Sequence, residues 1–408
     1  MIPPPLAGVR VIESSILGPA AITTALADLG ADVIKVETPA GDYIREMTWP
    51  IIQGVSLMHY HLNRGKRSAV LNLKTEAACE IYRELVRRAD IVIEASRPGA
   101  LARFGLGYEN LAAINPRIVF CSVSGYGMTG PYKDMPSHGI AYDTWSGIVI
   151  PAYDEDGFCY IPEHVSIGIN AAPLYGGLAV LAAVIRARAT GAGAFLDLAQ
   201  SDAAAAFDWY RSESYMAYAR PEDVVTGNKA DGWQRRPVAT AGMKEGVRYQ
   251  IYESADGHVL FMASEQAFWK NFCEGVARPE LFERWPGSKY ADHARGNREL
   301  QAILRDLFRT RSSREWLDFG VSQNVPIAPV NTPRNLVDDP QFRARFRILP
   351  HERHGADQLG FPVRFIGEEL PAPDCAPSAG QHTEAVLREV LGWDDARCTA
   401  ARKAGAFG

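Results

Sequence analysis

The amino-acid sequence predicts an α/β protein with a large Rossmann-like domain and a small α+β domain. Two observations predict this fold class. Over the first 125 residues, short β-branched runs alternate with helical patterns, which is typical of parallel strands joined by right-handed helical crossovers. After about residue 245 the pattern changes to a hairpin followed by several helices, which is typical of a separate α+β unit.

The predicted strands of the large domain are short apolar runs rich in valine and isoleucine: VRVIES, ADVIKVE, AVLNLK, DIVIEAS and IVFCSVSG. The helical segments between them are PAAITTALADLG, EAACEIYRELVRRA and ENLAAINP. In the second of these helices, Ala78, Ile81 and Leu85 recur at the spacing of one helix face, and Thr75 is the expected N-cap. We therefore expect that helix to face the core.

A further helix is expected from about Pro173 to Arg188, because Gly191 and Gly193 mark its end. The strand-like segment FLDLAQ follows, and a long helix is expected to begin near Asp202. These elements continue the alternation of strands and helices in the large domain.

The polar, glycine- and proline-rich stretch from about 220 to 245 indicates a linker or flap. After it, YQIYESADGHVLFMAS predicts a hairpin around the Asp256-Gly257 turn, and three helical segments follow: EQAFWKNFCEGV, NRELQAILRDLFRTR and SREWLDFGVSQN. We therefore expect the N-terminal part of the large domain over residues 1–220, the small domain over 221–330, and a return segment that completes the large domain over 331–408.

The composition is that of a soluble globular protein. Apolar residues make up 47% of the 408 residues and charged residues 22%, which excludes disordered and collagen-like classes. The formal net charge of -5 provides no overall attraction to nucleic acid phosphates. The six cysteines show no CxxC spacing, so neither a zinc site nor a disulfide framework is expected. The N-terminal segment MIPPPLAGVRVIESS has neither the pattern of a signal peptide nor that of a membrane span, so we expect a cytoplasmic protein with no membrane partner.

Two common enzyme motifs are missing from the sequence. The segment ESSILGPAAITT after the first predicted strand contains one glycine, so it lacks the GxGxxG pattern that lets a backbone approach a dinucleotide pyrophosphate. No GxSxG nucleophile elbow is present either. These absences argue against a nicotinamide dehydrogenase and against an α/β-hydrolase.

The order of several longer motifs resembles the family III CoA-transferases: LAGVRVIE, GPAAITTALADLGADVIKVETPAGDYIR, LNRGKRSAVLNLK, ADIVIEASRPGALARFGLGYENL, INPRIVFCSVSGYGMTGPY and GAGAFLDLAQSDA. This family includes formyl-CoA, carnitine and benzylsuccinate CoA-transferases and, as a side branch, α-methylacyl-CoA racemase. The resemblance covers nearly the whole chain. It implies a CoA thioester as substrate, no metal, and two subunits that interlock as rings.

The resemblance also implies where CoA binds. Leu71, Asn72, Leu73 and Lys74 would flank the adenine, and Arg103 would lie near the CoA phosphates. Two departures from the family pattern concern this site: Thr38 follows the KVE strand where arginine is frequent, and Ser96 and Arg97 stand in place of Asn-Phe. From the residues alone, the cations Arg64, Lys66 and Arg67 of NRGKRS are candidates for phosphate contacts, and a solvated basic turn is the alternative.

Transferases of this family use an aspartate that attacks the thioester and forms a mixed anhydride. The resemblance places that aspartate at Ile169, and the aspartate of the racemases at Gly168. Neither residue has a carboxylate, and the neighbouring Asn170 has no ionised form near neutral pH. A substitute could come from the acidic residues Asp154, Glu155, Asp156 and Glu163, for which a solvated hairpin tip is the alternative.

Other residues are candidates by position. His138 matches one half of the acid/base pair of the racemases, and a structural histidine is the alternative. The segment TGNKADGWQRRP matches the family's glycine-rich flap, where Arg235 and Arg236 could meet a carboxylate substrate, and an interdomain linker is the alternative. The aromatic residues of the helix beyond Asp202 are expected in the core or in a subunit interface: Trp209, Tyr210 and Tyr215.

Three functions therefore stay open. The first is a subunit of a hetero-oligomeric CoA-transferase, such as a benzylsuccinate-type transferase of aromatic degradation, whose homologous partner supplies the aspartate. The second is a self-sufficient transferase, or a racemase or isomerase, that uses another carboxylate or His138. The third is a non-catalytic acyl-CoA binding protein. The sequence places the first ahead, because the position expected to attack is not acidic.

Overall fold

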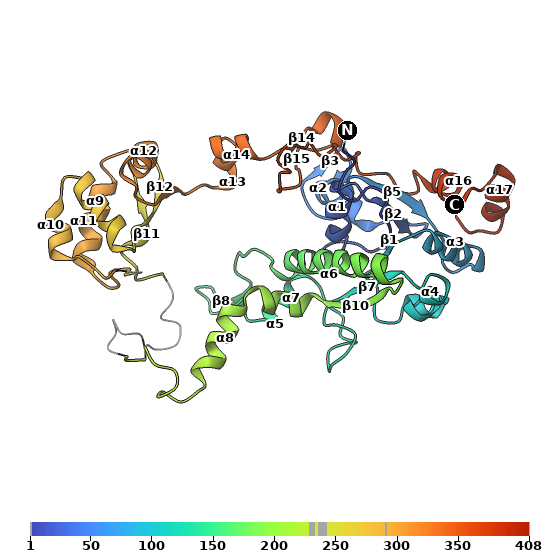
Figure 1. Ribbon diagram of the computed structural model, residues 1–408, viewed down its shortest axis with the longest axis horizontal. Coiled ribbons are helices and arrows are strands. Elements are labelled where there is room, and N and C mark those ends of the chain that lie inside the picture. The colour runs from blue at the N-terminus through green and yellow to red at the C-terminus, as the bar shows by residue number, and fades with distance from the viewer. Residues whose placement is uncertain (1, 228–232, 236–242, 290–291, 408) are drawn as a thin grey trace. The chain divides into compact units, whose positions relative to one another are not determined.

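A computed structural model of the chain describes residues 2–227, 233–235, 243–289 and 292–407 (Figure 1). The chain forms two compact units. One comprises Met1–Trp209 together with Phe346–Gly408, and the other comprises Tyr210–Arg345. The chain therefore leaves the first unit, builds the second, and returns to complete the first. We refer to them as the large unit and the small unit.

The large unit is built on a six-stranded sheet with the order β10-β7-β6-β1-β2-β5. All neighbouring strands in it are parallel, which confirms the predicted α/β fold. The strands are β1 (Arg10–Ser14), β2 (Asp32–Glu37), β5 (Lys66–Val70), β6 (Ile91–Glu94), β7 (Val119–Ser124) and β10 (Ala194–Ala199). Three small hairpins with strands of two residues each complete the list: β3 (Ile51–Ile52) with β4 (Val55–Ser56), β8 (Ala152–Tyr153) with β9 (Cys159–Tyr160), and β14 (Ile348–Leu349) with β15 (Gln358–Leu359).

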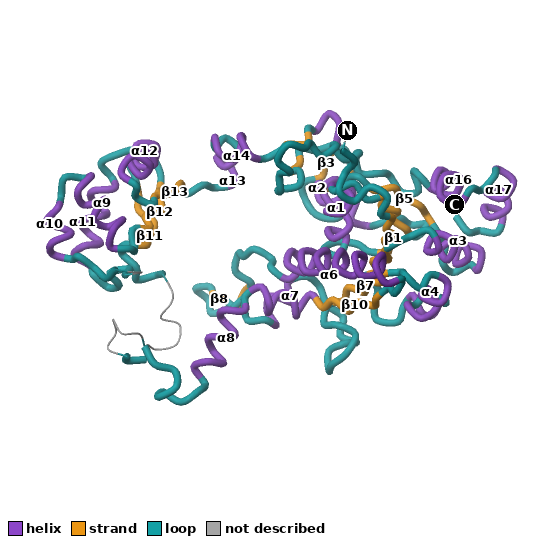
Figure 2. The backbone as a smooth tube through the Cα atoms, viewed as in Figure 1, coloured by secondary structure: helices purple, strands orange, loops and turns teal. Residues whose placement is uncertain are grey.

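Helices cover both faces of this sheet (Figure 2). Alternate strand residues point to opposite faces, so Val11 packs on one side and Ile12 on the other. One face is covered by α1 (Ala20–Asp28) and α6 (Gly168–Thr190), and the other by α3 (Glu76–Arg87), α4 (Tyr108–Ile114), α16 (Thr383–Leu391) and α17 (Asp395–Lys403). The remaining helices are α2 (Leu57–Asn63), α5 (Ile140–Trp145), α7 (Gln200–Phe207), α15 (His351–His354) and the 3-10 turns η1 (Tyr43–Arg45) and η2 (Leu101–Phe104).

The helix α3 confirms its prediction: the Thr75 hydroxyl accepts a hydrogen bond from the Ala78 N–H, and Ala78, Ile81 and Leu85 are buried. The strand predicted from AVLNLK is wrong at its end, because β5 stops at Val70. There the chain turns, since the Asn72 N–H donates to the Ala406 carbonyl and the Thr75 N–H donates to the Asn72 carbonyl, both at 2.8 Å. The segment from Leu71 to Lys74 is therefore a loop that leads into α3.

The helix α6 begins at Gly168, earlier than the predicted start at Pro173. Its buried residues Val180, Val184 and Ala187 pack into the core under the sheet. Within the described part of the chain, α6 is the one helix that is long and apolar enough to cross a membrane, judged by length and composition alone. A core helix of a soluble protein meets the same criterion, so this finding alone is weak evidence for a membrane span.

The small unit contains an antiparallel sheet with the order β11-β12-β13, formed by β11 (Tyr249–Glu253), β12 (His258–Met262) and β13 (Ile327–Pro329). The pairing of Glu253 with His258 confirms the predicted hairpin around Asp256 and Gly257. An aromatic core that includes Trp269, Phe308 and Trp316 fills the space between this sheet and its helices. The helices are α8 (Trp209–Tyr218), α9 (Gln266–Gly275), α10 (Pro279–Arg284), α11 (Arg298–Phe308), α12 (Ser313–Gln323), α13 (Pro333–Leu336) and α14 (Pro340–Arg345).

The long helix predicted from Asp202 is wrong, because α7 ends at Phe207 and α8 begins at Trp209. The prediction that the aromatic residues of this region lie in the core of the chain is also wrong. Trp209, Tyr210 and Tyr215 are between 54% and 72% exposed, and α8 buries none of its residues. A role for these side chains in a subunit interface stays a prediction.

Candidate active site

The strand order identifies the place where a ligand is expected in the large unit. From β1 the chain proceeds through β2 to β5 on one side, and then crosses to β6, β7 and β10 on the other side. The carboxyl ends of β1 and β6 therefore form a topological switch point, which is where open α/β sheets bind their ligands. The loop after β1 contains Gly18, and the loop after β6 contains Ser96 and Arg97. Two of the residues predicted to bind CoA thus follow a strand at this point.

A network of buried charges holds the carboxyl end of β1 in place. The Glu13 carboxylate lies 2.8 Å from Lys66 Nζ and 3.1 Å from Lys35 Nζ, and Lys35 Nζ also lies 3.0 Å from the Asp42 carboxylate. These four side chains are at most 2% exposed. The Lys66 ammonium also donates to the Ala20 carbonyl at 2.9 Å, which connects the network to the first turn of α1.

The charges in this network determine the ionisation of Glu13. Burial alone would raise the pKa of the Glu13 carboxyl, but the positive charges of Lys35 and Lys66 and hydrogen bonds from Lys66 and Thr23 lower it to about 2. Glu13 is therefore a carboxylate at neutral pH. It cannot act as a free nucleophile, because its two oxygens already accept hydrogen bonds from Ser15, Thr23 and Lys35 and face the Lys66 ammonium.

The three cations of NRGKRS belong to such ion pairs. Lys66 contacts Glu13, Arg64 Nη2 lies 2.7 Å from Asp28, and Arg67 Nη2 lies 2.7 Å from Asp32. The prediction that this cluster meets CoA phosphates is therefore wrong for Arg64 and Lys66, which are buried on carboxylates of the same chain. The alternative of a solvated basic turn is also wrong for Arg64 and Lys66, because both side chains are buried. Only contacts that connect distant parts of the chain reveal this role, so the local sequence gave no sign of it.

Ile169 lies at the loop that follows β1. A Cβ atom placed on Gly18 would be 3.2 Å from the Ile169 Cβ, and one placed on Gly139 would be 2.8 Å from the Ile169 Cγ2. The Ile169 side chain, which is half-buried, therefore packs between the loop after β1 and the start of α5. Because Pro173 has no N–H, it cannot donate the usual helical hydrogen bond to the Ile169 carbonyl. The position expected for the nucleophile thus adjoins the switch point and presents an apolar side chain.

The preceding residue, Gly168, is buried and has no room for a side chain. A Cβ atom there would lie 2.8 Å from the Tyr142 Cβ and 3.2 Å from the Gln200 carbonyl oxygen. A racemase-type aspartate at this position would force α5 and α6 apart. Gln200 adds a polar feature beside Gly18: its Nε2 donates to the Tyr142 hydroxyl at 3.3 Å, whereas its buried Oε1 has no hydrogen-bond partner among the described residues. A buried acceptor of this kind needs a donor from a ligand or water.

The buried acid in this region is Asp143, which the sequence analysis did not single out. The Asp143 carboxylate is 0% exposed and accepts hydrogen bonds from the Gly168 N–H at 2.8 Å and from the Ile167 N–H at 3.1 Å. The His164 Nε2 lies 3.6 Å from the same carboxylate. Asp143 therefore satisfies the free N–H groups at the start of α6, which explains why that helix begins before Pro173. A single acid on a short helix has no local pattern that would have revealed this contact.

The other predicted catalytic residues, His138 and Asn170, are exposed. His138 precedes Gly139, and its side chain makes no hydrogen bond to another described residue. Asn170 Nδ2 donates to the Ser166 carbonyl at 2.5 Å. The acidic segment around Asp154 is the exposed tip of the β8-β9 hairpin, where the Asp154 carboxylate accepts N–H groups of its own turn. This arrangement corresponds to the solvated hairpin tip.

The remaining predicted CoA contacts follow strands at the same edge of the sheet. Leu71 is buried, Asn72 and Leu73 are half-buried and Lys74 is exposed in the loop after β5, while Arg103 is exposed on η2. Since neighbouring strands are about 4.8 Å apart, the ends of β5 and β6 are separated by roughly 14 Å, a distance that an extended ligand can span. Within the described ranges, no group of three or more His, Cys, Asp or Glu side chains is placed to hold a metal ion.

The predicted flap lies in the small unit. Arg235 Nη2 donates to the Tyr218 carbonyl at 2.5 Å, and its guanidinium carbon lies 4.7 Å from the centre of the Tyr218 ring. Arg236 and residues 228–232 lie outside the described residues. Arg235 is thus held by α8, and its role toward a substrate stays a prediction.

Comparisons with known proteins agree with this architecture. The model of CoA-transferase family III matches residues 6–383. The succinyl-CoA:glutarate CoA-transferase of Homo sapiens is 30% identical over 404 residues, which cover 96% of this chain and 87% of that protein. The beta subunit of the succinyl-CoA–L-malate CoA-transferase of Chloroflexus aurantiacus is 28% identical and covers 96% of this chain and 95% of its own. The crystal structure of a CAIB/BAIF family protein from Brucella suis superposes with a TM-score of 0.75 at 29% identity, covering 95% of this chain and 100% of that chain.

Proposed function

This chain belongs to CoA-transferase family III, and from that premise we propose that it is the subunit of a hetero-oligomeric CoA-transferase that does not carry the nucleophile. The family transfers CoA between an acyl-CoA and a carboxylate. The single observation that carries the proposal is the apolar Ile169 beside Gly18, at the position where the resemblance leads us to expect the aspartate. A homologous partner with aspartate at that position performs the covalent steps.

The chemistry requires an ionised, accessible carboxylate. In the family's reaction the carboxylate attacks the thioester carbonyl, the C–S bond breaks and CoA leaves as a thiolate. The thiolate then attacks the aspartyl carbonyl of the mixed anhydride, the C–O bond breaks, and the donor acid leaves as a carboxylate while CoA stays on the aspartate as a thioester. The Ile169 side chain cannot do this, and Gly168 has no space for an acid. Asp143 has the right chemistry, but it is fully buried and its oxygens are held by the N–H groups of Ile167 and Gly168. A buried carboxylate that caps a helix does not reach a thioester without unfolding the start of α6.

The names of relatives suggest the substrate class. Similar proteins are named for transfer between succinyl-CoA and glutarate, L-malate or mesaconate, and one of them is named as a beta subunit. We propose that this chain takes part in transfer to a dicarboxylate, as in a benzylsuccinate-type transferase of aromatic degradation. The unpartnered Oε1 of Gln200 beside Gly18 supports a polar ligand at this point, because it can accept a hydrogen bond from a substrate hydroxyl or amide.

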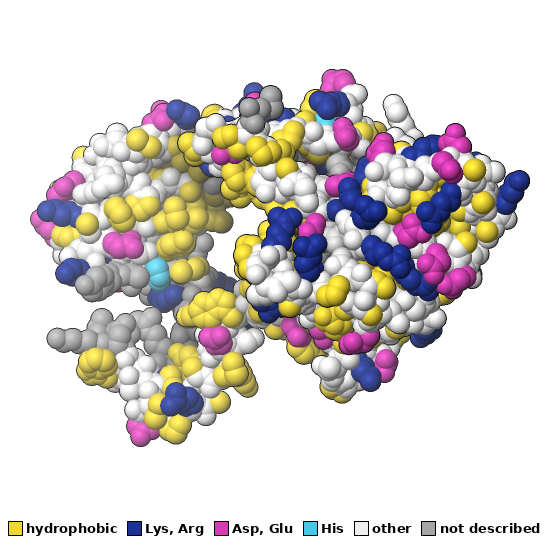
Figure 3. All heavy atoms as spheres, turned by 45° about the vertical axis from the view of Figure 1, so that its right-hand side comes forward, with side chains coloured by type: hydrophobic (Ala, Val, Ile, Leu, Met, Phe, Trp, Pro, Cys, Tyr) yellow, Lys and Arg dark blue, Asp and Glu magenta, His cyan; other side chains and the backbone are white. Residues whose placement is uncertain are grey.

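An apolar helix face supports the association with a second chain. On α6, Leu174, Leu178 and Ile185 are 67%, 70% and 71% exposed, although the helix is apolar on its buried side as well. Hydrophobic side chains are exposed in several places on the face of the molecule in Figure 3. A helix that is apolar all round is usually covered on all sides. We propose that a homologous subunit covers this face, in the interlocked arrangement that the family resemblance implies.

A second candidate function is proton chemistry on an acyl-CoA by His138. It is favoured by one contact: the residue that follows His138, Gly139, touches Ile169. A histidine at this place can reach a ligand at the switch point and exchange an α-proton with it. A racemisation also needs a second base, and neither Gly168 nor Ile169 provides one.

The test begins with the purified chain alone. It is incubated with succinyl-CoA and glutarate, and an enzyme-bound acyl group is trapped with hydroxylamine or borohydride. The proposal expects no adduct and no transfer from this chain, and both activities after addition of an aspartate-bearing homologue that co-purifies with it. An adduct on the isolated chain contradicts the proposal. The second candidate is established if the isolated chain exchanges the α-proton and the variant His138→Ala does not. If calorimetry detects CoA binding, but neither activity nor a partner is found, the chain is a non-catalytic acyl-CoA binding protein.

A further inference from the structure

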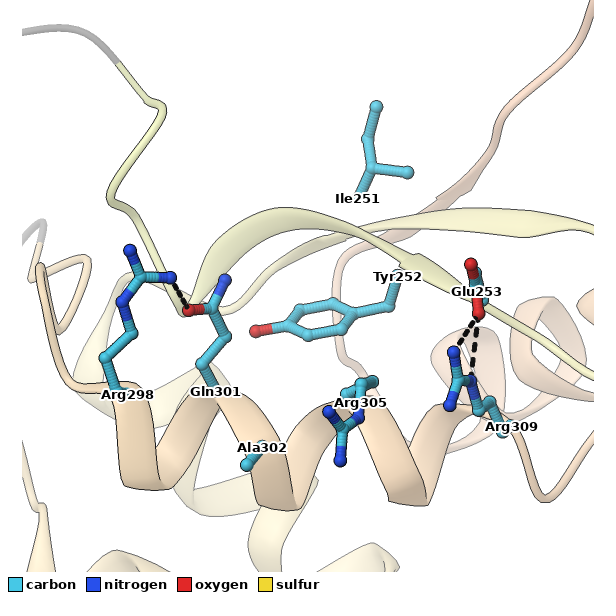
Figure 4. Close-up of a pocket in the computed structure, with 8 residues that line it drawn as sticks. All are labelled: Ile251, Tyr252, Glu253, Arg298, Gln301, Ala302, Arg305 and Arg309. Atoms are coloured by element: carbon cyan, nitrogen blue, oxygen red, sulfur yellow. Dashed lines mark hydrogen bonds and ion pairs between the residues drawn. The ribbon is translucent and has the colours of Figure 1, made fainter.

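The small unit contains a pocket between β11 and α11 that lies outside the predicted CoA site (Figure 4). Its volume is about 440 Å³, within the range of roughly 300–1,000 Å³ typical of small-molecule sites. The lining residues come from these two elements: Ile251, Tyr252 and Glu253 from β11, and Arg298, Gln301, Ala302, Arg305 and Arg309 from α11.

The pocket has a rigid floor. Tyr252 is 5% exposed, its hydroxyl donates to the Val247 carbonyl at 2.7 Å, and its ring stacks on Phe308 with a centroid distance of 4.9 Å. Figure 4 shows the Tyr252 ring between the strand and the helix, with Arg298, Arg305 and Arg309 on α11. The arginines therefore project from a helix that is packed on the aromatic core, and their backbone positions are fixed.

The charge of the lining is positive. The lining contains three arginines and one carboxylate. The carboxylate, that of Glu253, accepts a hydrogen bond from Arg309 Nε at 2.9 Å. Arg305 pairs with Asp306, a residue outside the lining. Arg298 Nη1 donates to the neutral amide oxygen of Gln301 at 2.8 Å, and among the described residues it has no ion pair. After the Arg309–Glu253 and Arg305–Asp306 pairs are discounted, the charge of Arg298 leaves an excess of positive charge in the pocket.

The spacing of these arginines determines what can bind them. Arg298 and Arg305 are seven residues apart, so their positions on α11 are separated by about 10 Å along the helix axis. Each guanidinium offers several N–H donors in a plane, which fits the oxygens of a phosphate or a carboxylate. A single small anion meets one of these groups, whereas a ligand with two anionic groups meets both.

We propose that this pocket binds a small organic or inorganic polyanion, with one anionic group on Arg298 and Gln301 and a second on Arg305. The anionic groups are phosphates or carboxylates, since both match the arginine geometry. Tyr252 supplies an apolar floor for the part of the ligand between them. The Arg309–Glu253 pair closes one end of the pocket and opposes binding there through the negative charge of Glu253.

The experiment uses the full chain and isothermal titration calorimetry at low salt with two probes, pyrophosphate for the phosphate class and citrate for the carboxylate class. We expect one or both to bind, and the double variant Arg298→Gln with Arg305→Gln to weaken binding at least about tenfold. The matched control is Arg314→Gln, which removes an exposed arginine of α12 that pairs with Asp318 outside the pocket. This control variant is expected to bind both probes with unchanged affinity. Tighter binding of pyrophosphate or of citrate identifies the class of ligand.

A second variant predicts a change in the opposite direction. Glu253→Gln removes the carboxylate next to Arg309, so we expect binding to tighten about three- to tenfold, which a loss of folding cannot produce. The proposal is wrong if neither probe binds, if the double variant binds as tightly as the unaltered chain, or if Glu253→Gln weakens binding. The last two results place the anion elsewhere, for example on the large unit.

Discussion

The Asp143 carboxylate accepts a hydrogen bond from the Gly168 N–H at 2.8 Å, so an acid on α5 caps the helix that carries the expected site of attack. The contact joins residues that are 25 positions apart and fixes the backbone immediately before Ile169. In this chain, an acid in the site therefore stabilises the scaffold while the reactive position is apolar.

Replacement of Asp143 by asparagine is expected to destabilise the large unit. Asparagine keeps one acceptor oxygen for the N–H groups of Ile167 and Gly168, but it loses the negative charge at the start of α6 and replaces the second oxygen, which accepts from the Ile167 N–H at 3.3 Å, by an amide donor. We expect a loss of about 1–3 kcal/mol in the free energy of unfolding, measured by urea denaturation. The matched control, Asp154→Asn at the exposed tip of the β8-β9 hairpin, is expected to cost less. Equal losses in the two variants would show that the cap contributes nothing special.

Introduction of an acid at Ile169 is expected to create the missing nucleophile. Because Ile169 adjoins Gly18 at the switch point, we expect Ile169→Asp to form a hydroxylamine-sensitive acyl adduct from succinyl-CoA, at least ~10-fold above the unaltered chain. Asn170→Asp places the same charge one residue further along and is expected to form none. Gly168→Asp should fail to fold normally, because its Cβ would lie 2.8 Å from Tyr142. An adduct of equal yield at residue 170 would mean that position 169 is not the point of attack.

The sequence predicted the parts of the structure that depend on local patterns. The β-branched runs became the parallel strands, and Thr75, Ala78 and Leu85 marked the N-cap and the buried face of α3 as expected. The start of α6 was predicted wrongly because its cap, Asp143, comes from a distant segment. The end of β5 was missed for the same physical reason, since the Asn72 N–H finds its acceptor at the far end of the chain.

For the site, the family resemblance indicated which residue replaces the nucleophile, but the residues alone did not reveal what surrounds it. The packing of Ile169 against Gly18 and Gly139 depends on three separate segments. Likewise, NRGKRS suggested phosphate contacts because a cluster of cations is visible in the sequence, whereas the partners of Arg64 and Lys66 are not. Ion pairs between distant residues have no periodicity from which they could be predicted.

The removal of the buried charge of Glu13 is expected to be costly. Glu13→Gln leaves the fully buried Lys66 without its carboxylate partner, and an unpaired buried charge destabilises a fold by about 3–5 kcal/mol. Chemical denaturation of the variant measures the loss. The control is Glu280→Gln, which breaks the exposed pair with Arg278 in the small unit and is expected to change stability little. A small effect in both variants would show that the network around Glu13 is not needed for folding.

The stability of the large unit is expected to decrease as the pH is lowered from about 6.5 to about 4, because of His59. Burial, together with the positive charge of Arg45, lowers the pKa of His59 from 6.5 to about 4 in the folded chain. In this range the unfolded chain takes up a proton that the folded chain does not, so the stability is complete above pH 6.5 and decreases as the pH falls. The shift corresponds to a loss of up to roughly 3 kcal/mol at this residue.

The His59 contribution can be isolated by comparing two acid titrations. In the folded chain the His59 Nε2–H donates to the Pro377 carbonyl at 3.0 Å, and Nδ1 accepts from the Asn63 amide at 3.0 Å. His59→Gln is expected to be less stable at neutral pH but to lose less stability between pH 6.5 and 4, as measured by thermal denaturation across that range. Parallel pH curves for the two proteins would show that His59 does not carry this dependence.

The hydrogen bond from Asn72 to Ala406 also determines when the protein can fold during its synthesis. Ala406 and Phe407 are buried in the core beside β5 and α3, far from both elements in the sequence. A ribosome that has translated the first strands must therefore also translate residues up to Phe407 before that core can close. The residues of the small unit are contiguous, so this unit is fully translated before the segment Phe346–Gly408, which completes the large unit.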